Sequence, residues 1–343
     1  MSESSFKPAW WLPGAHLQTL WPTLCRRNAK KLISKRERVE LPDGDFLDLN
    51  WVGKGKGPIV LILHGLEGSI ESTYAHGMMH AVLDRGWRGL FMHFRGCSGE
   101  PNRLPRSYHS GETADVDFVM RMVLKREPNT PMGAIGFSLG GNVLLKWLGE
   151  TGRTNPLTAA IAVSVPFELN KSATRIRKGL SYFYERHFLQ CLRTRLMKKF
   201  AGQELPVDLS VLSKMKSLRE FDDKFTAPLH GFSGVNEYYL LSSSRNYLSN
   251  IRVPTLLLQA DDDPLMPPDV IPGPHELPEQ VRLELTKGGG HVGFVSGHLP
   301  WKPRYWLEER VPQFLQAYLA VGRRLPDEEL ASEEGEGWLT SAP

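Results

Sequence analysis

Residues 132–141 read Met-Gly-Ala-Ile-Gly-Phe-Ser-Leu-Gly-Gly, and this stretch decides the fold. It starts as a short apolar run typical of a buried strand, and residues 139–149 continue with the spacing of a helix. Between the two, Gly136-Phe137-Ser138-Leu139-Gly140 fits the pattern G-x-S-x-G. Glycines on both sides of a serine permit a turn too tight for larger residues, and the turn exposes the hydroxyl at the start of a helix. We therefore predict that Ser138 is a nucleophile.

The same alternation of strand and helix extends in both directions along the chain. Helical patterns of ten to fifteen residues separate the apolar runs, which favours a mostly parallel sheet covered by helices on both faces. Two further short strands are predicted on either side of the turn at 42–45. The expected strands of the main pattern are 59–63, 89–94, 132–137, 158–165, 255–259 and 281–285, and the expected helices are 74–85, 112–125, 139–149 and 305–319.

The alternation is suspended between residues 166 and 250, where no convincing strand pattern occurs. We interpret this block as a helical lid inserted into a core formed by residues 36–165 and 251–322. Residues 1–35 form an aromatic arm whose prolines exclude a long helix. The arm is expected to pack across the core, or alternatively to wall the substrate pocket or touch a membrane. Residues 323–343 are predicted to be an acidic, disordered tail.

A serine hydroxyl needs a neighbouring base, and the base needs an acid that orients it. In chain order the acid and then the histidine should follow the nucleophile. His291 follows three glycines after the last predicted strand, and we predict that it is the base. Asp263 stands after the preceding strand and best matches the acid, although its neighbour Asp262 remains an alternative. His298 is expected to cap or pack.

Acyl chemistry also requires two backbone N–H groups that bind the developing oxyanion. The amide of Leu139, directly after the nucleophile, should be one donor. The turn His64-Gly65-Leu66-Glu67-Gly68 follows the first buried strand, and the Leu66 amide should be the other. His64 itself precedes the nucleophile, so we expect it to hold this loop. Cys97 has no ordered acid and base partners and is a weak candidate nucleophile.

The composition limits the kinds of partner that we expect the chain to bind. The 343 residues carry a formal net charge of +4, which does not by itself indicate nucleic acid binding. Three widely spaced cysteines fit neither a disulfide framework nor a zinc site. Without a signal peptide or a long apolar span, the chain is predicted to be cytoplasmic. Residues 171–199 hold nine basic residues and one acid, which indicates either a solvated helical face or weak peripheral contact with anionic membranes.

Taken together, these motifs resemble the AB-hydrolase-4 family of the α/β-hydrolase superfamily. The resemblance is carried by residues 64–68, 95–97, 136–142, 225–228, 262–264 and 290–291, and by His16-Leu17-Gln18-Thr19 in the arm. It extends from about residue 6 to residue 319 and implies the α/β-hydrolase fold. It also implies a charge relay of Ser138, Asp263 and His291 that cleaves acyl or lipid-like esters.

The expected reaction is carboxylic ester hydrolysis in two steps through an acyl-enzyme, with no metal and no organic cofactor. Two other functions remain open at this point. An alcohol acyltransferase would use the same acyl-enzyme, because an alcohol would then outcompete water. A binding protein that has kept the fold without the chemistry is the third interpretation.

Overall fold

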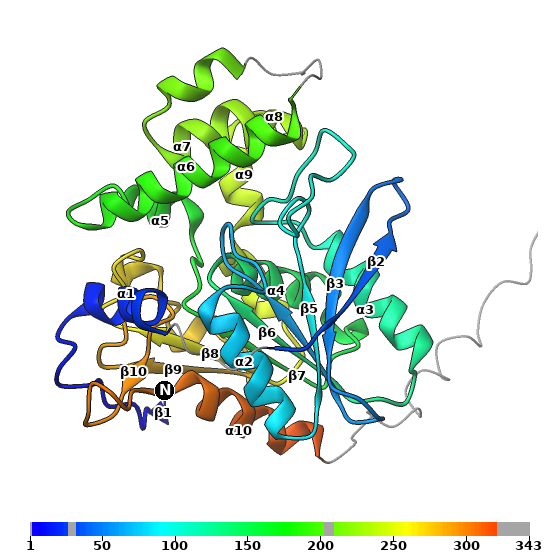
Figure 1. Cartoon of the computed structure of the whole chain (residues 1–343), viewed down its shortest axis with the longest axis vertical. Helices are drawn as coiled ribbons and strands as arrows, with labels where there is room; N and C mark the ends of the chain where they lie inside the picture. Colours follow the sequence, from blue (N-terminus) through cyan, green and yellow to red (C-terminus); the bar gives the residue numbers. More distant parts are fainter. Residues whose placement is uncertain (1, 27–31, 202–208, 321–343) are drawn as a thin grey trace, which may run out of the picture.

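One sheet organises the part of the chain that the computed structural model describes, residues 2–26, 32–201 and 209–320 (Figure 1). Nine strands of these ranges pair in a single sheet. The neighbouring pairs β1–β9, β9–β8, β8–β7, β7–β6, β6–β4 and β4–β5 are parallel, whereas β5–β3 and β3–β2 are antiparallel. In spatial order the strands are β1 (Ser2–Glu3), β9 (Val281–Thr286), β8 (Thr255–Ala260), β7 (Ala159–Val163), β6 (Met132–Phe137), β4 (Ile59–Leu63), β5 (Arg88–Met92), β3 (Phe46–Val52) and β2 (Lys35–Glu40).

Helices cover both faces of this sheet, so the core has two layers. Helices α2 (Thr73–Asp84) and α10 (Leu307–Leu319) pack on one face, and α3 (Ala114–Arg126) and α4 (Leu139–Thr151) pack on the other. Side chains of β4 alternate between the layers because successive residues of a strand point to opposite faces. Val60 and Ile62 join the α2/α10 layer, and Leu61 joins the α3/α4 layer. All three are fully buried, which explains why the strand sequence is continuously apolar.

The predicted strands and helices of the sheet and its covering layers are confirmed, with every boundary within two residues. One short hairpin was not predicted. It pairs β10 (Val295–Ser296) with β11 (Arg304–Tyr305), and α10 consequently begins at Leu307. Two residues are too few to display a hydrophobic period, so no sequence pattern marks these strands.

Helical segments fill the stretch between β7 and β8, and no strand occurs in its described part. We call residues 166–250 the insertion. Figure 1 shows α5 to α9 gathered above one end of the sheet. The insertion consists of α5 (Leu169–Arg175), α6 (Ser181–Lys199), η2 (Leu209–Lys214), α7 (Leu218–Phe221), the π-helical turn η3 (Asp222–Thr226), α8 (Ala227–Leu229), α9 (Val235–Ser242) and η4 (Ser244–Asn250). The remaining short turns are η1 (Gly152–Thr154), η5 (Pro268–Val270) and η6 (Pro274–Glu276).

The N-terminal arm contains a helix that we did not predict, because the arm is rich in proline. Helix α1 (Ala15–Cys25) begins after Pro13-Gly14 and accommodates Pro22 in its last turn. The strand β1, which precedes the arm's aromatic residues, extends the sheet by pairing with β9. The predicted acidic tail, residues 323–343, lies outside the described residues. None of the described helices combines the length and hydropathy needed to cross a membrane.

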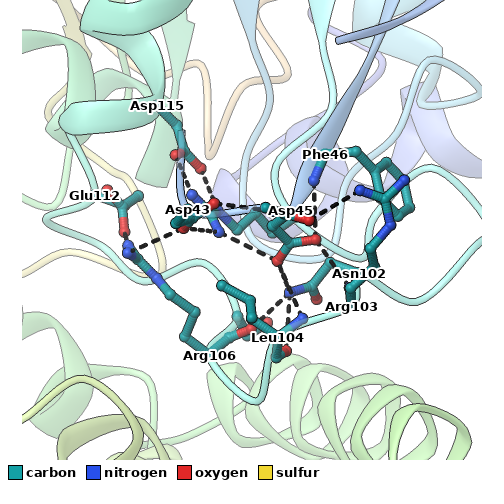
Figure 2. Close-up of polar contacts among 12 residues, drawn as sticks. Asp43, Asp45, Phe46, Asn102, Arg103, Leu104, Arg106, Glu112 and Asp115 are labelled. Carbon is teal, nitrogen blue, oxygen red and sulfur yellow. Dashed lines mark hydrogen bonds and ion pairs between the residues drawn. The ribbon is translucent and has the colours of Figure 1, made fainter. Parts of the chain in front are cut away.

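A buried ionic network fixes the long loop that connects β5 to α3. Arg95 binds both carboxylate oxygens of Asp115, at 2.8 and 2.7 Å, and also contacts Asp43 at 2.7 Å. Figure 2 shows the carboxylates of Asp43 and Asp45, from the β2–β3 turn, converging with Asp115 on this point. Asn102 donates to Asp45 at 2.6 Å and to the Arg106 carbonyl at 2.7 Å. The loop is therefore tied at several points before it reaches residues 107–110.

This network generates a prediction about stability. Replacing Asp115 with Asn should lower the free energy of unfolding by roughly 3 kcal/mol, because it deprives a buried guanidinium of its bidentate anion. Urea unfolding measures the loss. The matched control is Glu309→Gln, which breaks an exposed pair with Arg304 and should cost less than about 1 kcal/mol. Equal losses in the two variants would show that the buried pair has no special role.

Candidate active site

The turn between β6 and α4 holds Ser138 in a conformation that few residues adopt. Its φ is 51°, in the left-handed region that L-residues usually avoid. A Cβ at Gly136 would lie 2.4 Å from the Gly140 carbonyl oxygen, and a Cβ at Gly140 would lie 2.5 Å from the Leu63 and His64 oxygens. Only glycine therefore fits at either position. The Ser138 amide donates to the Val163 oxygen of β7 at 2.8 Å, which anchors the turn to the neighbouring strand.

Ser138, His291 and Asp263 form a continuous chain of hydrogen bonds. His291 Nε2 lies 2.9 Å from Ser138 Oγ, and His291 Nδ1 lies 2.8 Å from Asp263 Oδ2. Because a carboxylate only accepts, the proton on the histidine belongs on Nδ1, and Nε2 is left to accept from the serine hydroxyl. The Asp263 side chain is 2% exposed, and its second oxygen accepts from the Leu265 amide at 2.9 Å. The carboxylate is thus fixed in orientation.

The three consecutive aspartates have three separate partners. Asp261 accepts from the Gly288 amide at 2.8 Å, and Asp262 accepts from the Gly290 amide at 2.9 Å. Burial raises the pKa of Asp262. Both residues therefore support the backbone of the glycine-rich turn before His291, whereas Asp263 alone contacts the imidazole. Sequence reasoning left Asp262 and Asp263 open, and this geometry favours Asp263.

The N-terminal arm directly supports residues 288–295, which carry His291 and which we call the histidine loop. Sequence reasoning missed this role. The Thr19 hydroxyl accepts from the His291 amide at 2.8 Å. Gln18, which is 1% exposed, exchanges two hydrogen bonds with the Val295 backbone at 3.0 and 2.8 Å. The loop also passes very close to α1, since a Cβ at Gly293 would lie 2.1 Å from the Gln18 carbonyl oxygen. The only advance signal was the His16-Leu17-Gln18-Thr19 motif itself.

Leu66 and Leu139 both border the cavity that contains Ser138. The amides on either side of Leu66 are occupied, because Gly65 donates to the Tyr74 hydroxyl and Glu67 to the Tyr108 hydroxyl, both at 2.9 Å. The Leu66 and Leu139 amides have no acceptor among the described residues. Leu139 directly follows Ser138, and the residue before Leu66 also lies close to the serine, since a Cβ at Gly65 would be 3.3 Å from Ser138 Cβ. The two amides therefore stay the predicted oxyanion donors.

The insertion contacts the turn at residues 64–68 through Arg195 of α6. Its guanidinium lies 2.9 Å from Glu67 Oε1 and donates to the Ser107 hydroxyl at 2.6 Å. Glu67 has a φ of 55°, another left-handed residue that is not glycine. Such a conformation persists only where the surroundings hold it, and Arg195 and Tyr108 provide that support from two sides.

The other residues considered in the sequence analysis, His64, Cys97 and His298, do not join the hydrogen-bonded chain of Ser138, His291 and Asp263. His64 is fully buried, and its Nδ1 donates to the Gly65 carbonyl at 2.7 Å while Nε2 accepts from the Phe94 amide at 3.1 Å. Burial lowers the pKa of His64 to about 3, so the ring stays neutral and holds the loop. Burial likewise raises the pKa of the Cys97 thiol to about 12, which leaves no thiolate for attack. His298 is exposed in the β10–β11 turn, where its carbonyl accepts from the Trp10 indole at 3.0 Å.

The cavity above Ser138 is largely apolar. It encloses about 1050 Å³ of empty volume, part of it open to solvent. The insertion supplies most of the wall, including Ile176, Phe188, Leu192, Leu196, Phe221 and Phe225. The lining includes a polar cluster, in which Thr226 and Tyr239 donate to Asp222 at 2.7 Å and burial raises the pKa of Asp222 to about 6. No group of His, Cys, Asp and Glu suited to holding a metal ion occurs among the residues described.

Comparison with known proteins agrees with the fold. The family model of the alpha/beta hydrolase fold matches residues 58–297, which include every residue of the hydrogen-bonded chain. The chain belongs to the alpha/beta hydrolase fold family. Within it, the chain groups with proteins of the YheT and ABHD type, as the sequence motifs predicted.

Two relatives and one solved structure illustrate this placement. The Escherichia coli (strain K12) protein named "Putative esterase YheT" is 44% identical over 324 residues, covering 93% of this chain and 95% of that protein. Phospholipase ABHD3 of Mus musculus is 32% identical over 304 residues, covering 85% of this chain and 73% of that protein. The Pyrococcus furiosus esterase Pf2001 has the same fold, with a TM-score of 0.55 and 19% identity over 84% of this chain and 94% of that chain.

The contacts of α1 lead to a prediction about the histidine loop. Replacing Gln18 with Leu removes both hydrogen bonds to Val295. The buried Val295 N–H is then left without a partner, which costs about 1–3 kcal/mol, whereas the Val295 carbonyl still accepts from the Ala9 amide at 3.0 Å. Hydrogen–deuterium exchange of residues 290–296 should accelerate by about tenfold or more. Gln190→Leu, an exposed change on α6, should leave exchange in this segment unchanged. If Gln18→Leu also leaves it unchanged, α1 does not hold the loop.

Proposed function

We propose that this chain is a serine carboxylic ester hydrolase that acts through an acyl-enzyme on esters with apolar acyl groups. The observation that carries the proposal is the unbroken hydrogen-bonded sequence from Ser138 through His291 to Asp263, opening into an apolar cavity. The names of the relatives, an esterase and a phospholipase, agree with ester cleavage.

In the first step, Ser138 Oγ attacks the ester carbonyl carbon while His291 Nε2 takes the hydroxyl proton. The carbonyl oxygen becomes an oxyanion, which the Leu66 and Leu139 amides stabilise. Asp263 keeps the imidazole in the required tautomer and stabilises its positive charge. The C–O bond to the leaving group then breaks, and His291 gives its proton to the departing alcohol. The acyl group remains on Ser138.

In the second step, water replaces the alcohol and the same groups act again. His291 takes a proton from water, which attacks the acyl carbon and forms a second oxyanion at the same two amides. Collapse of this intermediate releases the carboxylic acid and restores the Ser138 hydroxyl with the proton from His291.

The apolar wall of the insertion supports a preference for hydrophobic acyl chains. Phe188, Leu192 and Phe225 line the cavity beside Ser138 and offer no hydrogen bonds to a polar acyl group. Burial of apolar surface would favour each added methylene by about 0.8 kcal/mol until the cavity is filled. In this proposal the insertion acts as a lid that selects the substrate and takes no part in bond cleavage.

Replacing Ser138 with Ala tests the nucleophile. In a series of chromogenic esters of increasing acyl length, kcat should fall by about 10⁶ for every ester, because the attacking hydroxyl is lost. Thermal unfolding of the variant should match that of the parent protein. The wild-type protein should prefer longer chains over acetate. Residual turnover within tenfold of wild type would contradict the assignment of Ser138.

The acid is tested by comparing two neighbouring substitutions. Asp263→Asn should lower kcat by roughly 10⁴, because an amide disturbs the tautomer and removes the charge opposite the imidazolium. Asp262→Asn is the matched control, since its side-chain oxygen still accepts from the Gly290 amide. We expect that control to retain most of the activity. A larger loss in Asp262→Asn than in Asp263→Asn would transfer the role to Asp262.

A further inference from the structure

Three segments far apart in the sequence expose large apolar side chains. They are the arm, the turn between α5 and α6 together with the start of α6, and the turn between β10 and β11. We call Trp10, Leu17, Leu24, Leu180, Phe183 and Trp301 the apolar face, and these side chains are between 47% and 74% exposed. Single exposed apolar residues are ordinary on protein surfaces, whereas a contiguous group of them indicates an interaction site.

Direct contacts show that the three segments are neighbours. The imidazole of His16 on α1 stacks on the Tyr184 ring of α6, with His16 Nδ1 3.1 Å from the Tyr184 hydroxyl. The indole nitrogens of Trp10 and Trp11 donate to the His298 and Gly297 oxygens, both at 3.0 Å. Figure 1 shows α1 and β10 on one side of the molecule, with the turn between α5 and α6 reaching out above them.

The three segments that form the apolar face carry an excess of basic residues, although Arg26, Lys171 and Arg304 are ion-paired with carboxylates outside these segments. Residues 4–26, 171–187 and 296–304 contain one acid, Glu185, and its side chain is buried. Lys178 and Arg186 are exposed, and neither has a carboxylate partner within the described ranges. A second copy of this chain would bring the same positive charge to the contact, so self-association through this face is disfavoured. A negatively charged, apolar surface is its natural complement.

We propose that the apolar face docks onto the surface of an anionic lipid bilayer. Tryptophan and tyrosine favour the boundary between lipid headgroups and acyl chains, and basic residues are attracted to anionic headgroups. The face therefore carries both features of a peripheral membrane site. It draws on the arm and the β10–β11 turn as well as on the basic part of the insertion.

This face adjoins the cavity of the candidate active site. Helix α6 turns Phe188 and Leu192 toward the cavity, whereas Phe183 and Arg186 near its beginning point outward. On α1, Leu17 and Leu24 are exposed while Thr19 contacts the His291 amide. The two helices that would touch lipid are thus the ones that wall the cavity and support the histidine. Docking would place the cavity beside a source of apolar substrates.

Vesicle flotation with the full chain tests the proposal. The probes are vesicles of phosphatidylcholine alone and of equimolar phosphatidylcholine and phosphatidylglycerol. We expect binding to the mixed vesicles at low salt and at least about tenfold weaker binding to the neutral ones, because two or more basic residues contribute near the surface. Raising the ionic strength should weaken binding, since exposed charges are screened within about 8 Å at physiological salt.

Paired substitutions separate the apolar and the basic contributions. Leu24→Gln with Phe183→Gln should weaken binding to mixed vesicles by about tenfold or more, and Lys178→Gln with Arg186→Gln should weaken it similarly and reduce its salt dependence. The matched controls are Leu240→Gln with Leu241→Gln, exposed leucines of α9, and Lys54→Gln with Lys56→Gln in the β3–β4 turn. Both controls should bind as wild type does. Circular dichroism and thermal unfolding show that each variant is folded.

The result does not depend on the proposed ester chemistry, because Ser138→Ala should bind vesicles as tightly as wild type. The absence of binding to mixed vesicles at low salt would overturn the proposal. Equal binding to neutral and anionic vesicles would overturn its electrostatic basis. Losses in the control pairs as large as those in the test pairs would show that binding is nonspecific and would overturn the assignment of this face.

Discussion

The close approach of three backbone segments at the end of β6 is the constraint on which the rest of the site depends. Gly136 faces Gly140 across the turn, and Gly140 in turn abuts the carbonyl groups of Leu63 and His64 at the end of β4. This contact forces Ser138 into its left-handed conformation and brings the loop after β4 beside it, because β4 and β6 are adjacent strands. A Cβ at Gly65 would lie 3.3 Å from Ser138 Cβ. One packing requirement thus fixes both the serine and its neighbouring amides.

The histidine loop reaches the serine by a second set of unusual conformations. Val292 and Phe294 have φ values of 60° and 43°, and three glycines with positive φ precede them. Conformations of this kind are retained only where surrounding contacts determine them. Ser164 accepts from the Val292 amide at 3.1 Å, while Gln18 and Thr19 bind the backbone on the other side. The arm is therefore an integral part of the fold, since without it the His291 amide and the Val295 amide would lose their hydrogen-bond partners.

The elements of the sheet could be predicted from the sequence because central strands such as β4 are continuous apolar runs, β9 alternates apolar and charged residues, and the covering helices have a clear period. The structure of the arm could not be predicted, because α1 contains Pro22 and β1 has only two residues. The β10–β11 hairpin was missed for the same reason as β1, since each of its strands also has only two residues. For the candidate acid, the sequence favoured Asp263 and kept its neighbour Asp262 as an alternative. Only side-chain direction in space separates Asp262 from Asp263, and composition carries no information about it.

The contacts of α6 link the cavity wall to the amides beside the serine. Its inner side contributes Leu192 and Leu196 to the cavity, and Arg195 lies between them in sequence. Arg195 pairs with Glu67, the residue directly after Leu66, and Tyr108 binds both the backbone and the carboxylate of Glu67. Further along the helix, Lys199 donates to the Arg106 carbonyl at 2.7 Å, within the loop that the Arg95 network anchors. Because these contacts share residues, a displacement of α6 would open the cavity and release Glu67 together. Helix α6 and the loop that holds Leu66 and Glu67 are therefore coupled, which makes the covering of the cavity and the geometry beside Ser138 interdependent.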